Sequence, residues 1–175
     1  DLLEFARDLS EYAKVYATLP DGENLSEISF SDHEKRFFHV IRELEISTVF
    51  PLVLYLYKHV EDRDELIQIL RLLESYLMRR AIGKFTTKNY NNLFISLLSE
   101  LKDRDNLTCD TVRDILLGYG ESSNKFPDDQ EFEQAFHSIA LINKYSREVL
   151  FCIALKHLDN ERTDNPKLSI HGMSV

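Results

Sequence analysis

The sequence predicts an all-α fold, an irregular bundle of about seven or eight helices followed by a short irregular or extended C-terminal tail. Apolar residues recur at steps of three and four along most of the chain, which is the spacing of a helix face. Only five glycines and four prolines occur, a low number for an all-β or loop-rich fold. With 43% hydrophobic residues among 175, the chain has enough apolar side chains for a core that needs no disulfide or metal.

The N-terminal part of the chain is expected to form two helices. Residues 2–19 carry one apolar stripe, and Pro20 ends this helix, so that 20–30 is expected to be a loop. Ser31 and Glu34 have the spacing of a capping box, which would start the second helix. The buried face of this second helix would consist of Phe37, Phe38, Ile41 and Leu44.

The next two expected helices form the centre of the chain. The segment STVFPLVLYLY is rich in β-branched and aromatic residues, but Pro51 fits the first turn of a helix better than a central strand. Asp62 or Asp64 then caps a long helix over 64–82, which ends where Gly83 supplies a left-handed residue. The core stripe of this long helix would be Leu66, Leu70, Leu73, Leu77 and Ala81.

Two shorter helices are expected after the long one. Thr86 or Thr87 starts the first of them, and Thr108 caps the second, which ends at Gly118. The buried residues of the first would be Tyr90, Leu93, Phe94, Leu97 and Leu101, and those of the second Val112, Ile115 and Leu116.

The last two helices follow the loop GYGESSNKFPDD. Asp128 or Asp129 starts a helix through Phe132 and Phe136, and a final helix covers about 146–157. The inward residues of the final helix would be Val149, Leu150, Ile153 and Ala154.

The helical domain is expected to cover residues 1–159, and the pattern then changes to a tail at 160–175. A short strand is expected within this tail at 167–170. Because the first residue is Asp1 rather than Met, we expect the chain to be a piece of a longer protein.

Charge is distributed unevenly along the sequence. The chain has a net charge of −9, yet residues 79–99 include Arg79, Arg80, Lys84 and Lys88 and not one Asp or Glu. Phosphate binding requires Lys and Arg to gather at the contact, so this segment is the candidate contact with nucleic acid or with another domain. The alternative for Arg80 is structural, because it continues an apolar stripe and would then need a carboxylate or backbone carbonyls as partners.

No pattern in the sequence predicts catalysis. Six histidines are scattered without metal-ligand spacing, and neither Cys109 nor Cys152 belongs to a motif. Acidic clusters at 61–65 and 127–133 are typical of helix starts, and no glycine-rich phosphate loop is present. We therefore expect no catalytic residue, no metal and no cofactor in this chain. The longest apolar run, 49–57, is too short to cross a membrane, and we expect a cytoplasmic protein with reduced thiols.

Four segments resemble the central helical region of the GmrSD-like restriction nucleases, in the same order as in that family. These segments are STVFPLVLYLY (47–57), LESYLMRRAIGKFTTKNYNNLF (73–94), FPDDQEFEQAF (126–136) and REVLFCIALKHLDNE with PKLSI (147–170). In that family, a ParB-like N-terminal domain precedes the helices and an HNH-type nuclease domain follows them. The resemblance thus implies a parent chain that is a nucleotide-dependent endonuclease against foreign or modified DNA.

The catalytic motifs of that family are missing from this chain. Neither the Asp-Gly-Gln-Gln-Arg motif of the ParB-like domain nor the Glu-His-Ile-x-Pro box of the nuclease occurs, and His171 is not assigned the role of the catalytic histidine. We expect this chain to be a non-catalytic scaffold whose partners are the flanking domains of the same protein, with DNA as a further partner and no membrane. Two alternatives are a DNA-contacting module that uses the basic 79–88 segment, and a stand-alone adaptor that binds proteins through its acidic faces.

Overall fold

The computed structural model describes residues 2–21, 25, 27–85, 87–120, 124–138, 143–161 and 167–169. Within these ranges the protein has eight α-helices and two short strands, so the predicted all-α bundle is confirmed. In chain order the elements are α1 (Leu2–Tyr16), β1 (Glu27–Ser29), α2 (His33–Glu43), a 3-10 turn (Ser47–Val49), α3 (Phe50–His59), α4 (Arg63–Ile82), α5 (Tyr90–Lys102), α6 (Cys109–Gly118), α7 (Asp129–Ser138), α8 (Asn143–Glu161) and β2 (Lys167–Ser169).

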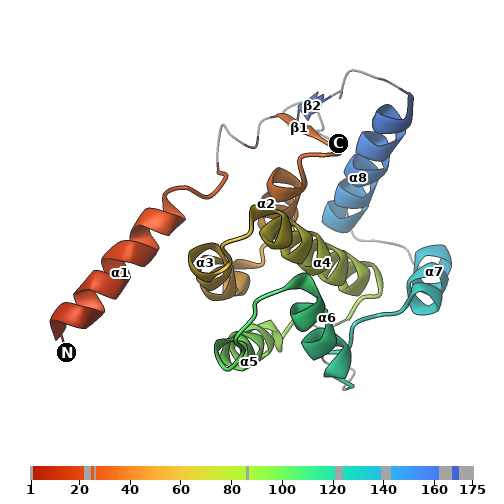
Figure 1. The fold of residues 1–175 in the computed structure, drawn as a ribbon. Helices are drawn as coiled ribbons and strands as arrows, with labels where there is room; N and C mark the ends of the chain where they lie inside the picture. Colours follow the sequence, from red (N-terminus) through yellow and green to blue (C-terminus); the bar gives the residue numbers. More distant parts are fainter. Residues whose placement is uncertain are drawn as a thin grey trace.

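The bundle is organised around α4, the longest helix (Figure 1). Helices α2, α6 and α7 contact α4 directly, and α3 packs on α5. Helix α8 contacts α2, while α1 extends from the body and contacts α3 (Figure 1). The centre of the molecule is therefore a set of short helices gathered along one long helix.

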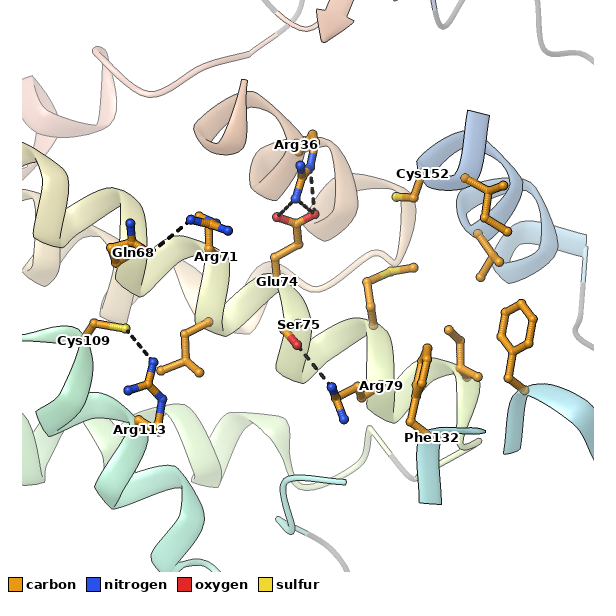
Figure 2. A pocket seen from close by; sticks show the side chains of 16 residues that line it. Arg36, Gln68, Arg71, Glu74, Ser75, Arg79, Cys109, Arg113, Phe132 and Cys152 are labelled. Atoms are coloured by element: carbon orange, nitrogen blue, oxygen red, sulfur yellow. Dashed lines mark hydrogen bonds and ion pairs between the residues drawn. The ribbon is translucent and has the colours of Figure 1, made fainter. Parts of the chain in front are cut away.

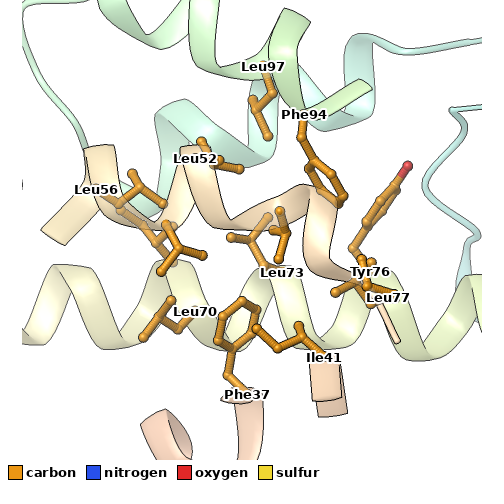
Figure 3. Packing of buried hydrophobic residues seen from close by; sticks show 14 of the residues in the cluster. Phe37, Ile41, Leu52, Leu56, Leu70, Leu73, Tyr76, Leu77, Phe94 and Leu97 are labelled. Atoms are coloured by element: carbon orange, nitrogen blue, oxygen red, sulfur yellow. The ribbon is translucent and has the colours of Figure 1, made fainter. Parts of the chain in front are cut away.

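The predicted apolar stripe of α4 lies in the core. Its five members Leu66, Leu70, Leu73, Leu77 and Ala81 are all buried. Figure 3 shows Leu70 and Leu73 of α4 between Phe37 of α2 and Leu52 of α3. The predicted inward faces of α2, α5 and α6 are confirmed as well, and Pro51 lies in the first turn of α3. Burial of this continuous stripe is the main source of stability that the fold has.

Side-chain caps begin three of the helices where the sequence predicted them. Asp62 Oδ1 accepts hydrogen bonds from the backbone amides of Asp64 and Glu65, and Thr108 Oγ1 accepts from the amide of Thr111. Asp128 and Glu131 form a reciprocal capping box, in which each carboxylate accepts from the other's backbone amide.

The expected capping box at Ser31 and Glu34 is wrong. Helix α2 begins after Asp32, whose carboxylate accepts instead from the amide of Ser29. The carboxylate of Glu34 accepts from the hydroxyl of Tyr57 and from the guanidinium of Arg63 at 2.5 Å. Long-range partners on α3 and α4 therefore take the carboxylate away from the local cap.

The end of α4 also differs from the prediction. Gly83 has a φ of −70°, and Lys84 rather than Gly83 adopts the left-handed conformation, with a φ of 52°. A glycine is needed at 83 for a different reason, because a Cβ there would lie 2.5 Å from the ring of Phe85. Helix α5 begins at Tyr90, not at a threonine; Thr87 lies in the preceding turn, and Thr86 lies outside the described residues.

Two corrections concern the ends of the domain. Strand β1 lies within the expected loop at 20–30 and pairs antiparallel with β2, with Ile28 opposite Leu168. Helix α8, expected over about 146–157, spans Asn143–Glu161. The strand predicted at 167–170 is present as β2 over Lys167–Ser169, and residues 170–175, with His171, lie outside the described part of the chain.

Helix α8 faces the body with a side that only partly matches the predicted one: Val149 is buried, as predicted. Leu150 and Ile153, expected inside, are 60% and 51% exposed, whereas Phe151 and Leu155 are buried. These two pack with Ile28 of β1 in a small second core. Part of the inward face of α8 thus packs on a short strand that the sequence did not reveal.

Truncation of Leu73 should cost more stability than truncation of any exposed leucine-sized side chain. The variant Leu73→Ala removes a fully buried side chain at the centre of α4, and we expect the free energy of unfolding to fall by about 2–5 kcal/mol. The measurement is urea denaturation followed by circular dichroism. Ile95→Ala is the matched control, because Ile95 on α5 is 54% exposed, and its loss should be below about 0.5 kcal/mol. Equal losses in the two variants would contradict the packing described.

Candidate functional site

The two arginines of the basic segment hold the chain segment that precedes α7. Arg80 is fully buried, and its Nη1 donates to the backbone carbonyl of Lys125 at 2.9 Å. Arg79 is partly exposed; it donates to the carbonyl of Pro127 at 3.1 Å and forms an ion pair with Asp129. Both guanidinium groups therefore bind residues of this same chain.

Aromatic rings enclose the buried guanidinium of Arg80. Its central carbon lies 5.0 Å from the ring centre of Phe85 and 5.5 Å from those of Tyr76 and Tyr90. Such contacts stabilise a cation that is removed from water. Burial raises the pKa of Tyr76 and Tyr90, and the charge of Arg80 opposes that rise in both.

Further hydrogen bonds hold residues 124–129, which we call the clamped segment. The Tyr76 hydroxyl donates to the carbonyl of Asn124 at 2.9 Å, and the Asn89 amide donates to the Asn124 side chain at 2.7 Å. Phe126 packs on Tyr76 with 5.3 Å between ring centres. The clamped segment therefore connects the C-terminal half of α4 to the start of α7.

The two lysines of the basic segment have a different environment from the arginines. Lys84 and Lys88 are exposed on either side of the turn between α4 and α5. The structure thus separates the four candidate residues into a pair that points into the fold and a pair that remains at the surface. A surface built from only two lysines is a small footprint for binding nucleic acid, where affinity grows with the number of phosphates neutralised.

A second polar cluster, which the sequence did not predict, joins α2 to α8. His39 Nε2 lies 2.9 Å from Glu148 Oε2, and both side chains are at most 4% exposed. Arg42 is within 3.3 Å of His39 Nδ1, and since a guanidinium only donates, Nδ1 accepts and Nε2 carries the hydrogen toward Glu148. Because this pair is enclosed, it fastens α8 to α2 and offers no access to a substrate. The one sign in the sequence is Glu148 itself, a charge within an apolar stretch.

A neighbouring ion pair joins α2 to α4. The Arg36 guanidinium donates to both oxygens of Glu74, with distances of 2.9–3.1 Å, and to the backbone carbonyl of Phe30. Burial raises the pKa of Glu74, while the charge and hydrogen bonds of Arg36 oppose the rise. The pair lies on the wall of a cavity and gives that wall a fixed, largely neutral patch.

The cavity has a volume of about 700 Å³ and lies between α4, α6, α7 and α8 (Figure 2). Arg71 and Arg113 flank one end of it, and Phe132 and Phe136 of α7 line another part of its wall. Figure 2 shows Arg79 between these regions, next to Ser75. A cavity of this size is within the range of small-molecule sites.

The structure bears on two of the groups that the sequence raised, the cysteines and the metal ligands. Burial raises the pKa of both Cys109 and Cys152, so that their thiols stay protonated at neutral pH. Within the described ranges, no three His, Cys, Asp or Glu side chains are close enough to hold a metal ion. Among the described helices, none is both long enough and apolar enough to cross a membrane.

Comparison of the chain with family models, curated proteins and solved structures gives no match.

Loss of Arg80 should destabilise the protein much more than loss of Arg79. Arg80→Ala leaves the Lys125 carbonyl without its donor and empties the space among three aromatic rings, so we expect a loss of about 3 kcal/mol. Arg79→Gln breaks a pair with a 93% exposed carboxylate and should cost about 1 kcal/mol or less. Urea denaturation measures both. Similar small losses would show that Arg80 has no structural role.

Both native cysteines should react slowly with a thiol reagent in the folded protein. Because burial raises their pKa, little thiolate is present at pH 7.5, and we expect rates at least about tenfold below that of an exposed thiol. The measurement is the reaction with Ellman's reagent in buffer and in urea. Ser99→Cys, at an exposed position of α5, supplies the reference thiol. A native cysteine that reacts faster than this reference would indicate an activated nucleophile.

Proposed function

We propose that this chain is a non-catalytic helical scaffold that holds the flanking domains of a GmrSD-like, nucleotide-dependent, DNA-cleaving restriction or phage-defence protein. The resemblance of four ordered segments to that family motivates the context. The observation that carries the scaffold role is the apolar face of α1, which the body of the domain leaves uncovered.

The apolar side chains of α1 follow one stripe along the helix. Leu2, Phe5 and Leu9 are 81%, 66% and 60% exposed, and no residue of α1 is buried. The opposite face carries charged residues such as Arg7 and Lys14, so the helix is amphipathic. A continuous exposed apolar surface of this kind is typical of a protein interaction site.

The C-terminal end of α1 is fixed to the body. Lys58 of α3 binds Glu11 at 2.6 Å and lies over the ring of Tyr12, and Tyr16 packs on Phe50 with 5.9 Å between ring centres. The stripe therefore begins on α3 and continues beyond it along a helix about 22 Å long (Figure 1). Such a projecting helix presents its first two turns to a partner.

A flanking domain of the same protein is the partner that we propose for this face. Contacts on the far side of the bundle favour a scaffold over a DNA module, because Arg79 and Arg80 bind the clamped segment. Two bound elements at different positions, one on α1 and one beyond α8, would be held at a fixed separation by the packed helices between them. The domain would then transmit the position of one neighbour to the other.

In the parent protein, α1 should be protected by a neighbouring domain. We expect hydrogen exchange of the α1 amides to be at least about tenfold slower in the parent protein than in this chain alone, because burial of the apolar face stabilises the helix. Phe5→Glu/Leu9→Glu should remove this protection, and Arg7→Glu, on the opposite face, should retain it. Mass spectrometry of peptic peptides reads out each case.

Three outcomes would contradict this proposal. The first is equal exchange of α1 in the parent protein and in the isolated chain. The second is a concentration-dependent dimer that Phe5→Glu/Leu9→Glu abolishes in the isolated chain, which would assign the face to a second copy. The third is salt-sensitive binding of duplex DNA that Lys84→Gln/Lys88→Gln abolishes, which would favour the DNA module.

A further inference from the structure

We infer that the cavity between α4, α6, α7 and α8 binds a small organic anion, one with a single anionic group on an apolar body. This inference concerns a ligand site on the opposite side of the body from α1 and does not depend on the scaffold role. It rests on the arginines at one end of the cavity, on the exposed apolar side chains at another, and on the space between them.

Arg71 and Arg113 supply the anion-binding end. Among the described residues, the hydrogen bond of the Arg71 guanidinium is from Nη1 to Gln68 at 3.2 Å, so Nε and Nη2 have donors to offer. Arg113 binds Asp110, whose carboxylate is 83% exposed, and its Nη2 is 3.6 Å from the sulfur of Cys109. Burial raises the pKa of Cys109; the charges of Arg113 and Arg71 oppose that rise, while Glu65 and Asp110 add to it, so both guanidinium groups lie near this thiol together with two carboxylates.

The other charged groups on the cavity wall are largely paired with one another or with nearby residues. Arg36 neutralises Glu74, the one carboxylate among the residues that line the cavity. Arg79 already donates to Ser75, to the Pro127 carbonyl and to Asp129, and it contributes positive potential rather than free donors. Arg113 is likewise paired with Asp110, so among the four arginines that line the cavity, Arg71 is the one with no carboxylate partner in the described part of the chain. An anion is the ligand that its open donors select.

Apolar side chains form the remainder of the cavity wall. Phe132 and Phe136 of α7 lie with their rings 6.0 Å apart, and Phe136 is 45% exposed. Ile153 of α8 also lines the cavity and is 51% exposed. An apolar body placed there would cover these side chains, which a bare inorganic ion would leave in water. The ligand is therefore an organic anion rather than free phosphate or sulfate.

A pair of related fluorescent probes distinguishes the contribution of the arginines to binding from that of the apolar wall. Anilinonaphthalene sulfonate is an aromatic anion, and N-phenylnaphthylamine has the same aromatic body without a charge. We expect the anion to bind once per chain and at least about tenfold more tightly than the neutral probe, since charge-assisted hydrogen bonds from guanidinium groups add to the apolar contact.

Variants at the rim of the cavity assign the binding to these residues. Arg71→Gln/Arg113→Gln should weaken the affinity for the anionic probe at least about tenfold. The affinity for the neutral probe should stay within about twofold of the native value. Arg104→Gln is the matched control, since Arg104 is exposed in the α5–α6 connection and does not line the cavity. Arg71, Arg104 and Arg113 are all exposed, so we expect the variants to fold, and circular dichroism with urea denaturation verifies this for each.

Competition identifies the body of the ligand. Displacement of the probe by dodecanoate would indicate an aliphatic body, and displacement by phenyl phosphate an aromatic one; either supports the site. Equal displacement by inorganic phosphate would overturn the requirement for an apolar body. Unchanged affinity in Arg71→Gln/Arg113→Gln, or loss of binding in Phe5→Glu/Leu9→Glu on α1, would overturn the site itself.

Discussion

The structure depends on a guanidinium group that has no contact with water. Arg80 lies at the C-terminal end of α4, where three aromatic rings surround it and the Lys125 carbonyl accepts from it. A buried cation is tolerated only if the aromatic rings and the carbonyl that surround it are in position. The clamped segment must therefore lie against α4 for the core to close, and α7 begins where the clamped segment ends. Together with Arg79 and Tyr76, Arg80 therefore holds the clamped segment, and with it the start of α7, against the core helix.

The spacing of residues along the sequence was sufficient to predict those features of the fold that depend on a single helix. The α4 stripe from Leu66 to Ala81 and the caps at Asp62 and Thr108 depend on residues within four positions of each other. The sequence was misleading where a distant partner competes. Glu34 binds Tyr57 and Arg63 instead of capping α2. Glu148 of α8 faces inward, where it pairs with His39 of α2. Neither pairing has a signature in sequence spacing.

The candidate site illustrates the same limit. The basic 79–88 segment stood out because it lacks acids, but its partners at 125–129 are 45 or more residues away, and those partners make the arginines structural. Arg71 and Arg113, which lie around one cavity, belong to two helices and to two unremarkable stretches of sequence. Only the packing of α6 against α4 brings them together. Exposure separates the two roles, since a buried arginine holds the fold and one at a cavity rim is available to a ligand.

Hydrogen exchange in Arg80→Met tests the central role of Arg80 most directly, because methionine keeps most of the side-chain volume while removing the charge and the donors. We predict that amides of the clamped segment and of α7 exchange at least about tenfold faster than in the native protein, while amides of α2 and of the first half of α4 keep their rates. An unchanged rate in α7, or a uniform increase over the whole chain, would contradict the dependence of α7 on this buried guanidinium.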